Sequence, residues 1–156
     1  MTPRFDTTRA AQLVRAARDD RGLSQAELAG AAGMSQPHIA AIESGRRKVG
    51  AAVLERILQA ADYRPSVALE SQTGAVVEAG ARHGIHNIRV FGSAAEGADH
   101  FTSDIDLLAE VEAGRGYFDI GAFISEVEQI TGFPVDLIVD GPRAPEFVRR
   151  GELVAL

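Results

Sequence analysis

The stretch "FGSAAEGADHFTSDIDL", Phe91 to Leu107, decides how the second half of this chain folds. At its end two acids alternate with two aliphatic residues, because Ile105 follows Asp104 and Leu107 follows Asp106. Residues two apart in a strand share a face, so the alternation predicts a strand with both carboxylates on one face and both aliphatic side chains on the other. Carboxylates this close repel each other unless a cation compensates, and Mg²⁺ prefers oxygen ligands. The stretch therefore predicts a magnesium site.

The run "PVDLIVD" offers a third carboxylate for the same site. We assign Asp136 to it because apolar residues flank this aspartate, whereas Asp140 lies beside a Gly-Pro pair and is expected to serve a turn. Three carboxylates could hold two Mg²⁺ ions, which in phosphoryl transfer clamp the attacking and leaving oxygens. Since Mg²⁺ prefers oxygen to nitrogen, the histidines of this half are expected to be ordinary loop or surface residues; they are His83, His86 and His100.

A Gly-Ser pair follows the strand that is predicted to end at Phe91. Gly92 would let the backbone approach a phosphate closely, and Ser93 is expected to cap a short helix that ends at Gly97. The serine hydroxyl and the free N–H groups of that helix would then face the triphosphate of a nucleotide. We also assign Ser103, directly before the first aspartate, to this nucleotide site.

The whole chain divides into a helical half and a half of mixed pattern. Apolar residues recur at helical spacing from Thr8 to about Tyr63, and residues 66–84 are expected to form a further helix. Beyond them, short β-branched runs bounded by Gly, Pro and Asp predict strands. We therefore predict two domains, an all-α bundle at residues 1–66 and a small α/β domain with a short mixed sheet at residues 67–156. The helix expected between the second and third strands has an apolar stripe of Phe118, Phe123, Ile124 and Val127.

Two short helices joined by a tight turn are predicted inside the helical half. Ser24 and Glu27 have the spacing of a capping box at the start of the first helix. Gly33 supplies the turn, and Ser35 is expected to cap the second helix. Preceded by one helix and followed by another, this pair has the helix-turn-helix layout.

The run "LSQAELAGAAGMSQPHIAAIESGRRKV" closely resembles the lambda-repressor/Cro-like (XRE-type) helix-turn-helix family over roughly residues 8–63. The resemblance implies a DNA operator as partner, with the second helix of the pair in the major groove. The residues it places at base edges are Ser35, Gln36 and His38, and those it places near phosphates are Gln25, Arg46, Arg47 and Lys48. The alternative of a helical bundle that serves only dimerisation or protein contact stays open. Residues 1–70 carry ten basic against eight acidic residues, and this net positive charge is modest for a DNA-binding domain.

The stretch from Phe91 to Leu107 resembles the signature of the DNA-polymerase-beta-like nucleotidyltransferases, and specifically of their minimal branch. This resemblance covers about residues 72–156 and implies transfer of a nucleoside monophosphate from a nucleoside triphosphate, with ATP as the expected donor. It also implies that the three aspartates are both the catalytic residues and the metal ligands. Many relatives carry a basic residue between the two glycines, where this chain has Ala94, Ala95 and Glu96. This departure from the family pattern bears on the expected turnover rate.

The fusion of these two domains resembles the antitoxin of HEPN/MNT toxin–antitoxin pairs. That resemblance implies a chain that represses its own operon and silences a toxin encoded nearby by nucleotidyl transfer. It would act as a homodimer on DNA or as a hetero-oligomer with the toxin. Two alternatives stay open: a transcriptional repressor whose second half only binds or senses nucleotide, and an antibiotic-modifying nucleotidyltransferase.

The composition fits a folded protein with no membrane partner. Hydrophobic residues make up 46% of the 156 residues, and the chain has no cysteine. No apolar run approaches the ~18 residues of a membrane span, and the N-terminus lacks the apolar region of a signal peptide, so a cytoplasmic location is expected. Residues 71–156 carry six basic and fourteen acidic residues, which argues against contact between this half and a nucleic-acid backbone unless cations intervene.

Overall fold

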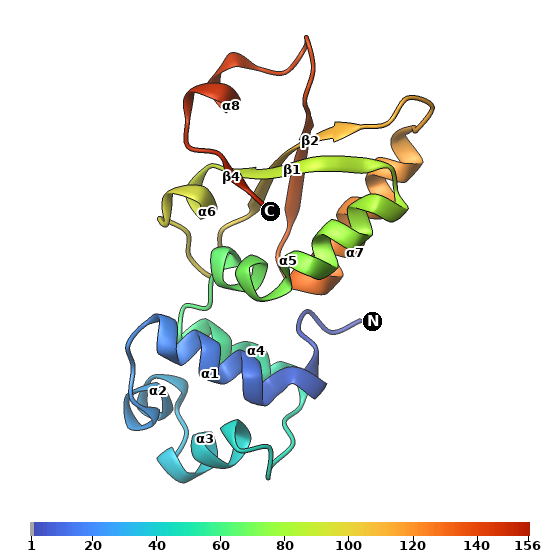
Figure 1. Ribbon diagram of the computed structural model, residues 1–156. Coiled ribbons are helices and arrows are strands. Elements are labelled where there is room, and N and C mark those ends of the chain that lie inside the picture. Colours follow the sequence, from blue (N-terminus) through green and yellow to red (C-terminus); the bar gives the residue numbers. More distant parts are fainter. Residues whose placement is uncertain (1) are drawn as a thin grey trace.

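The helical half and the α/β half are stacked on each other in the computed structural model, which describes residues 2–156 (Figure 1). The helical half lies below in this view, and the sheet with its two long helices lies above. Buried apolar side chains of both halves belong to one continuous core. Within residues 2–156, no helix combines the length and the apolar character needed to cross a membrane.

The helical half contains the two helices and the tight turn expected from the sequence. The Ser24 hydroxyl accepts a hydrogen bond from the Glu27 N–H at 3.0 Å, and the Glu27 carboxylate accepts from the Ser24 N–H at 3.1 Å, so the capping box is confirmed. Gly33 ends the first helix of the pair with a left-handed φ of 67°. The elements of this half are η1 (Thr7–Arg9), α1 (Ala10–Asp20), α2 (Gln25–Ala32), α3 (Gln36–Glu43) and α4 (Ala51–Ala60).

Ser35 stands at the N-cap position of α3, but its side chain makes no capping hydrogen bond, so that part of the expectation is wrong. An N-cap side chain bonds to the N–H of the second or third helical residue. The second residue here is Pro37, which has no N–H, and the third, His38, donates to the backbone oxygen of Ser35 at 3.1 Å. The Ser35 hydroxyl is therefore left exposed at the surface of α3.

The α/β half has the mixed sheet that the sequence predicts, in the order β3-β2-β1-β4. Strands β2 and β3 are parallel, whereas β1 is antiparallel to both β2 and β4. Helices α5 and α7 lie side by side on one face of the sheet (Figure 1). The elements of this half are α5 (Pro65–Arg82), β1 (Ile85–Phe91), α6 (Ser93–Glu96), β2 (Ile105–Val111), α7 (Tyr117–Thr131), β3 (Val135–Val139), α8 (Glu146–Arg150) and β4 (Val154–Ala155).

The apolar stripe of α7 differs from the expected one at Phe118. Phe123 and Val127 are fully buried and Ile124 is half-buried, as predicted, but Phe118 is 95% exposed. Phe118 and Val127 are nine residues apart, which at about 3.6 residues per turn is two and a half turns. The two side chains therefore leave the helix on opposite sides, and only one of them can face the sheet.

Four aromatic rings from distant parts of the chain meet where the two halves touch. Phe5 comes from the N-terminal segment, Tyr63 from the end of the helical half, Phe101 from the loop before β2, and Phe133 from the segment before β3. Phe133 lies 5.7–6.2 Å from each of the other three, measured between ring centroids. Aromatic pairs at this spacing add to the gain from burying their area. The cluster fastens the helical half to the loops that lead into two strands.

Arg4 passes through this junction and holds the same loops by hydrogen bonds. Its Nε donates to the Gly132 oxygen at 2.7 Å, and its Nη2 donates to the Phe101 oxygen at 3.3 Å. Its Nη1 lies 3.4 Å from a carboxylate oxygen of Glu55 on α4. The guanidinium carbon also lies 4.3 Å from the centroid of the Phe101 ring, within cation–π range. One side chain thus links the N-terminal arm, α4 and the segments that enter β2 and β3.

The buried carboxylate of Asp99 makes a second connection between the halves. It accepts hydrogen bonds from the Ser66 N–H at 2.7 Å and from the Ser66 hydroxyl at 3.1 Å, at the start of α5. It also accepts from Arg64 at 3.3 Å, and Arg64 in turn pairs with Asp20 on α1 at 2.8 Å. Asp99 therefore caps α5 from a loop that lies 33 residues further along the chain.

Asp99→Ala should lower the free energy of unfolding by about 2–4 kcal/mol, because it strands a buried N–H and part of a guanidinium without their acceptor. Chemical denaturation followed by circular dichroism measures the change. Asp19→Ala, which removes an exposed carboxylate from α1, is the control and should cost less than about 0.5 kcal/mol. Equal effects of the two substitutions would contradict the capping role of Asp99.

Candidate functional site

The three aspartates singled out by the sequence come together on the face of the sheet that α5 and α7 leave open. Asp106 and Asp136 are partners in the parallel register of β2 and β3, and Asp104 directly precedes β2. Asp106 is half-buried and the other two are exposed. Ile105 and Leu107, which alternate with the acids, are fully buried in the core. The predicted division of the strand into an acidic face and an apolar face is confirmed.

The carboxylates influence one another electrostatically. Burial raises the pKa of Asp106, and the negative charges of Asp136 and Asp104 raise that pKa further. Within residues 2–156, no basic side chain forms an ion pair with any of the three, whereas Asp140 is paired with two arginines. Carboxylate oxygens are the ligands that Mg²⁺ prefers, so the donor chemistry fits this ion. The side chains are not preset for it, since no group of three or more His, Cys, Asp or Glu within residues 2–156 is placed to hold a metal ion.

The turn after β1 lies directly against this acidic face. Gly92 has a φ of 72°, in the region that favours glycine. A Cβ added to Gly92 would stand 2.6 Å from the Oδ2 of Asp106, which is closer than real contacts allow. A side chain here would displace the carboxylate, so glycine is required both by backbone conformation and by space. The Gly-Ser turn and the aspartates therefore form one site.

The short helix after this turn differs in one detail from the prediction. Gly92 occupies the N-cap position of α6 and Ser93 is its first helical residue, so Ser93 is not the capping residue. Gly92 has a φ of 72° and a ψ of −152°, which are not helical, and α6 begins at Ser93, one residue earlier than a serine cap would allow. Gly97 ends α6 with a φ of 70°, as expected. The half-buried Ser93 hydroxyl makes no hydrogen bond to the rest of the described chain, while Glu96 is exposed.

Ser103 has a structural task in addition to its predicted place in the nucleotide site. Its hydroxyl accepts a hydrogen bond from the His100 N–H at 2.9 Å, and its own N–H donates to the His100 oxygen at 2.9 Å. These two bonds close the turn that leads into Asp104. The role of Ser103 toward a nucleotide stays a prediction.

Asp140 does not serve the turn that was expected of it. Its carboxylate accepts hydrogen bonds from Arg149 at 2.5 Å and from Arg89 at 2.8 Å. These bonds lower the pKa of Asp140 to about 2. The reason is tertiary: β1 brings Arg89 beside the end of β3 from 51 residues away, and the turn into α8 brings back Arg149, nine residues further along the chain.

The three histidines of the α/β half are each paired with an acid. His83 lies 2.9 Å from Glu126, His86 lies 2.6 Å from Glu112, and His100 lies 2.8 Å from Asp62, measured from ring nitrogen to carboxylate oxygen. They join helices and loops and do not stand among the three aspartates. Their place outside the metal site stays a prediction.

A row of hydrogen bonds connects α2 and α3 at the predicted DNA-contacting surface. The Gln36 amide donates to the Gln25 oxygen at 2.9 Å, and the Gln25 amide donates to Glu43 at 2.5 Å. Burial would raise the pKa of Glu43, but the hydrogen bonds from Arg18 and Gln25 outweigh it and lower that pKa. Glu43, which is buried and paired with Arg18, therefore fixes the orientation of Gln25, and Gln25 in turn fixes that of the exposed Gln36. The sequence contained Glu43 within the family motif, but no local signal marked it as buried.

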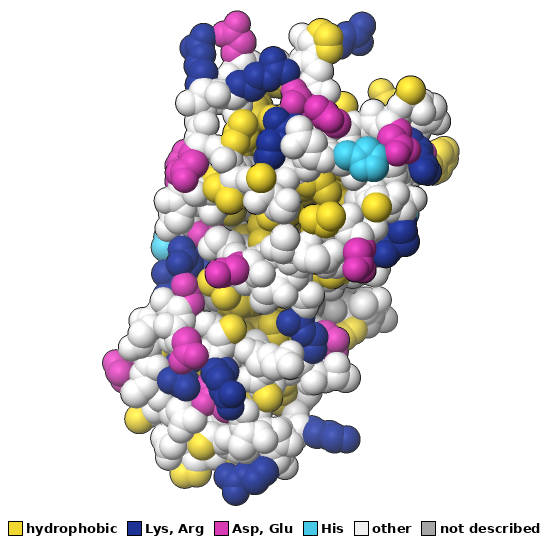
Figure 2. Space-filling view, in the orientation of Figure 1, with side chains coloured by type: hydrophobic (Ala, Val, Ile, Leu, Met, Phe, Trp, Pro, Cys, Tyr) yellow, Lys and Arg dark blue, Asp and Glu magenta, His cyan; other side chains and the backbone are white. Residues whose placement is uncertain are grey.

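The basic residues after α3 are free to meet a polyanion. Figure 2 shows Lys and Arg side chains at the lower end of the molecule, where the helix-turn-helix lies. Arg46, Arg47 and Lys48 are exposed, and the only hydrogen bond among their described side chains joins Arg46 to the Ser44 hydroxyl at 3.1 Å. His38 is half-buried on α3. Whether these residues contact DNA stays a prediction from the resemblance.

Comparison with known proteins identifies both halves. Residues 14–67 match the helix-turn-helix family, and residues 76–150 match the nucleotidyltransferase-domain family. A protein of Methanocaldococcus jannaschii named "Putative protein adenylyltransferase" is 35% identical over 57 residues, which are 36% of this chain and 61% of that protein. This chain thus matches less than two thirds of that relative's length. A solved structure described as a "putative minimal nucleotidyltransferase" is 35% identical with a TM-score of 0.53, over 60% of this chain and 98% of the other.

Asp106→Asn should raise the unfolding temperature at about pH 7 in EDTA, because the raised pKa of Asp106 means that its ionised form is disfavoured in the folded state. The gain should shrink as the pH falls through the raised pKa of Asp106, because the wild-type carboxylate then takes up a proton. Added Mg²⁺ should stabilise the wild type more than the variant. Thermal scans across this pH range measure all three effects.

Asp140→Asn is the matched control with the opposite sign. The lowered pKa of Asp140 means that its charge stabilises the fold at neutral pH, and that this contribution is lost as the pH falls from about 4 to about 2. The variant should therefore unfold at a lower temperature than wild type at about pH 7. If Asp106→Asn lowered the unfolding temperature as well, the repulsion assigned to the three aspartates would be wrong.

Proposed function

This chain belongs to the nucleotidyltransferase-domain family and carries a helix-turn-helix domain in front of it, and on that premise we propose that it transfers a nucleoside monophosphate from ATP to a hydroxyl of a partner protein. The observation that carries the proposal is the contact between the Gly92 turn and Asp106, beside Asp136 on the next strand. Phosphoryl transfer needs a binding site for the donor phosphates, ligands for the cation and an acceptor for the proton. We propose that the turn provides the first and that the clustered carboxylates provide the other two.

The proposed reaction is one displacement at phosphorus. The acceptor oxygen bonds to the α-phosphorus, the bond from that phosphorus to the oxygen bridging to the β-phosphate breaks, and pyrophosphate leaves. Asp136 takes the proton of the hydroxyl, because its exposed carboxylate is open to an incoming partner. Gly92 leaves room for the phosphates, and the unbonded hydroxyl of Ser93 donates to one of their oxygens. Gly97 and Ser103 support this seat by shaping α6 and the loop before Asp104.

The three aspartates are the proposed ligands of Mg²⁺. Bound there, the ion would supply positive charge against the phosphates and against the repulsion among the carboxylates. Support comes from the oxygen-only donor set and from the raised pKa of Asp106, which burial and the negative charges of Asp136 and Asp104 cause and which a bound cation would oppose. The exposed positions of Asp104 and Asp136 leave their side chains free to turn toward an ion.

We also propose that the helix-turn-helix half binds an operator at the chain's own gene as a dimer, and that the acceptor is a toxin encoded nearby. The exposed Gln36 at the start of α3 and the exposed basic run after it support DNA contact. The toxin as partner rests on analogy with antitoxins of this domain arrangement, which is weaker support than side-chain geometry.

A repressor that senses nucleotide without turnover is the second candidate. Two points favour it: no metal-holding group is preset within residues 2–156, and α6 carries the acidic Glu96 where the family resemblance leads us to expect a basic residue. Both candidates expect nucleotide at the Gly92 turn, but only the first expects a modified partner.

Co-expression with the product of the adjacent gene should add one or more nucleoside monophosphates to that protein, visible by intact-mass spectrometry. Asp136→Ala should abolish the added mass while Mg²⁺–ATP still binds through the other two aspartates. Glu110→Gln, an exposed acid of the same sheet, is the matched control and should leave transfer unchanged. If the partner is neutralised but never modified, the transferase function is wrong and the repressor that senses nucleotide takes its place.

The full chain should bind a two-fold symmetric DNA site upstream of its own gene, with an affinity that falls steeply as salt rises. Arg46→Ala and Lys48→Ala should each flatten the plot of log affinity against log salt by roughly one contact, whereas Gln36→Ala should relax base preference. Arg56→Ala, an exposed arginine of α4, is the control and should leave the slope unchanged. Fluorescence anisotropy measures the affinities, and binding without sequence preference at every salt concentration would disprove the recognition-helix assignment.

A further inference from the structure

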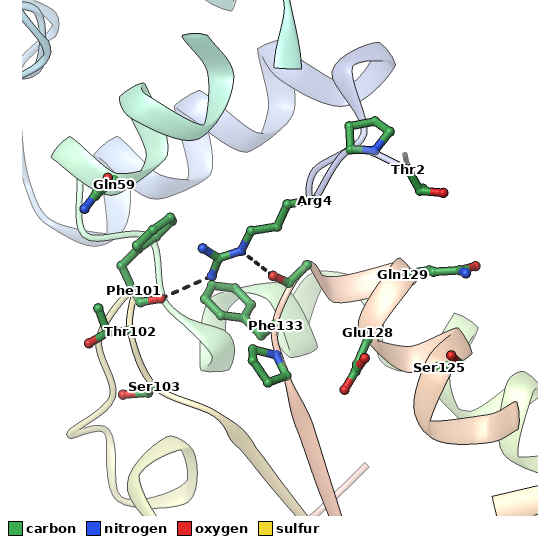
Figure 3. Close-up of a pocket in the computed structure, with 13 residues that line it drawn as sticks. Thr2, Arg4, Gln59, Phe101, Thr102, Ser103, Ser125, Glu128, Gln129 and Phe133 are labelled. Atoms are coloured by element: carbon green, nitrogen blue, oxygen red, sulfur yellow. Dashed lines mark hydrogen bonds between the residues drawn. The ribbon is translucent and has the colours of Figure 1, made fainter. Parts of the chain in front are cut away.

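A cavity of about 680 Å³ opens at the junction of the two halves, and the proposed donor site does not account for it. Figure 3 shows Arg4 of the N-terminal arm at one side, Thr102 and Ser103 from the loop before β2 at another, and Ser125 and Glu128 of α7 opposite them. Its volume lies in the range of pockets that bind small molecules or peptide side chains, roughly 300–1,000 Å³.

The cavity adjoins the acidic face of the sheet. Ser103 lines it and is followed in the chain by Asp104, while Pro134 lines it and lies two residues before Asp136. Residues two apart in an extended chain share a face and lie about 7 Å apart. Asp136 therefore follows Pro134 on the side of the segment that lines the cavity. The Ile105 N–H donates to the Pro134 oxygen at 2.8 Å, which ties the two edges together. A molecule in the cavity would therefore reach the aspartates from the side.

The charge of the cavity selects against phosphate and for a cation. Arg4 is the one basic residue among its described lining, and carbonyl oxygens, Glu55 and aromatic rings already occupy its guanidinium. Glu128 uses one carboxylate oxygen to accept from the Val135 N–H at 3.1 Å, and the other accepts nothing from residues 2–156. Because Arg4 is already paired, the charge that has no partner is negative: it belongs to Glu128 in the lining and to Asp104 and Asp136, which follow the lining residues Ser103 and Pro134 closely in the chain. Negative charge beside a cleft attracts cationic ligands.

The walls also suit the long stems of basic side chains. Pro3 and Pro134 present exposed apolar surface, and polar groups between them come from Thr102, Ser125 and Gln129. Lys and Arg side chains pack their methylene stems on apolar surface and keep the charged end near acceptors.

We propose that this cavity is the acceptor site, and that it binds a basic polypeptide segment that presents a hydroxyl to Asp136. The inference rests on the transferase function proposed above and names where the acceptor docks and with what charge. The step is the displacement already written: the acceptor oxygen bonds to the α-phosphorus of ATP, pyrophosphate departs, and the proton passes to Asp136.

The test uses the full chain and two synthetic peptides, Lys-Lys-Tyr-Lys-Lys and Glu-Glu-Tyr-Glu-Glu, each titrated without nucleotide and followed by amide chemical shifts. The basic peptide should shift the amides of Thr102, Ser103 and Gln129, and the acidic peptide should not. Glu128→Gln keeps the oxygen that accepts from Val135 but removes the charge, and it should weaken the basic peptide by about two- to fivefold. Gln129→Lys, at an exposed position of the cavity, should weaken it similarly.

Glu78→Gln, which removes an exposed acid of α5 that does not line this cavity, is the matched control and should leave peptide affinity unchanged. Equal binding of the two peptides, or equal effects of Glu128→Gln and Glu78→Gln, would overturn the acceptor site even if transfer to a partner is found. The basic peptide binding in the cavity without any transfer from Mg²⁺–ATP to it or to the co-expressed partner would leave the site standing and overturn the transferase function.

Discussion

The guanidinium of Arg4 is the interaction on which the relation between the two halves depends. It donates to the backbone before β2 and to the backbone before β3, and it stacks on the ring of Phe101. A cation can be held among aromatic rings only when its donors are satisfied, and here two carbonyls and Glu55 satisfy them. Because the segments it holds lead directly into Asp104 and Asp136, the N-terminal arm sets the frame in which the carboxylates stand.

Electrostatic contrast within one sheet marks the site more clearly than any single residue. Asp106 and Asp140 lie on or beside neighbouring strands, yet their pKa values move in opposite directions, Asp106 upward and Asp140 downward to about 2. The fold supplies two arginines to Asp140 and none to Asp106, which faces two further carboxylates. A half-buried acid beside two further carboxylates contributes nothing to folding, and this arrangement supports the proposed use of the site for a cation and a proton.

Patterns within a few residues were enough to predict much of this arrangement. The alternation at Asp104 to Leu107 predicted the two faces of β2, and the capping residues Ser24 and Glu27 predicted the start of α2. The same local reasoning failed where position on the helix or in the chain mattered more than residue type. Phe118 is apolar but lies on the wrong side of α7, and Ser93 is a good capping residue but is itself the first helical residue, so that Gly92 takes the N-cap position.

The order of residues alone determined the helix-turn-helix pattern and the acidic face of β2, because these depend on periodicity. Pairings across long stretches of chain were decided only in three dimensions. Asp99 caps α5 across 33 residues, Arg4 reaches Gly132 across 128, and the cavity is lined jointly by the N-terminal arm and α7, which the Arg4 contact helps to hold together. No local pattern encodes such contacts, since a hydrogen bond between distant residues depends on how packed elements place them and on which buried groups lack other partners.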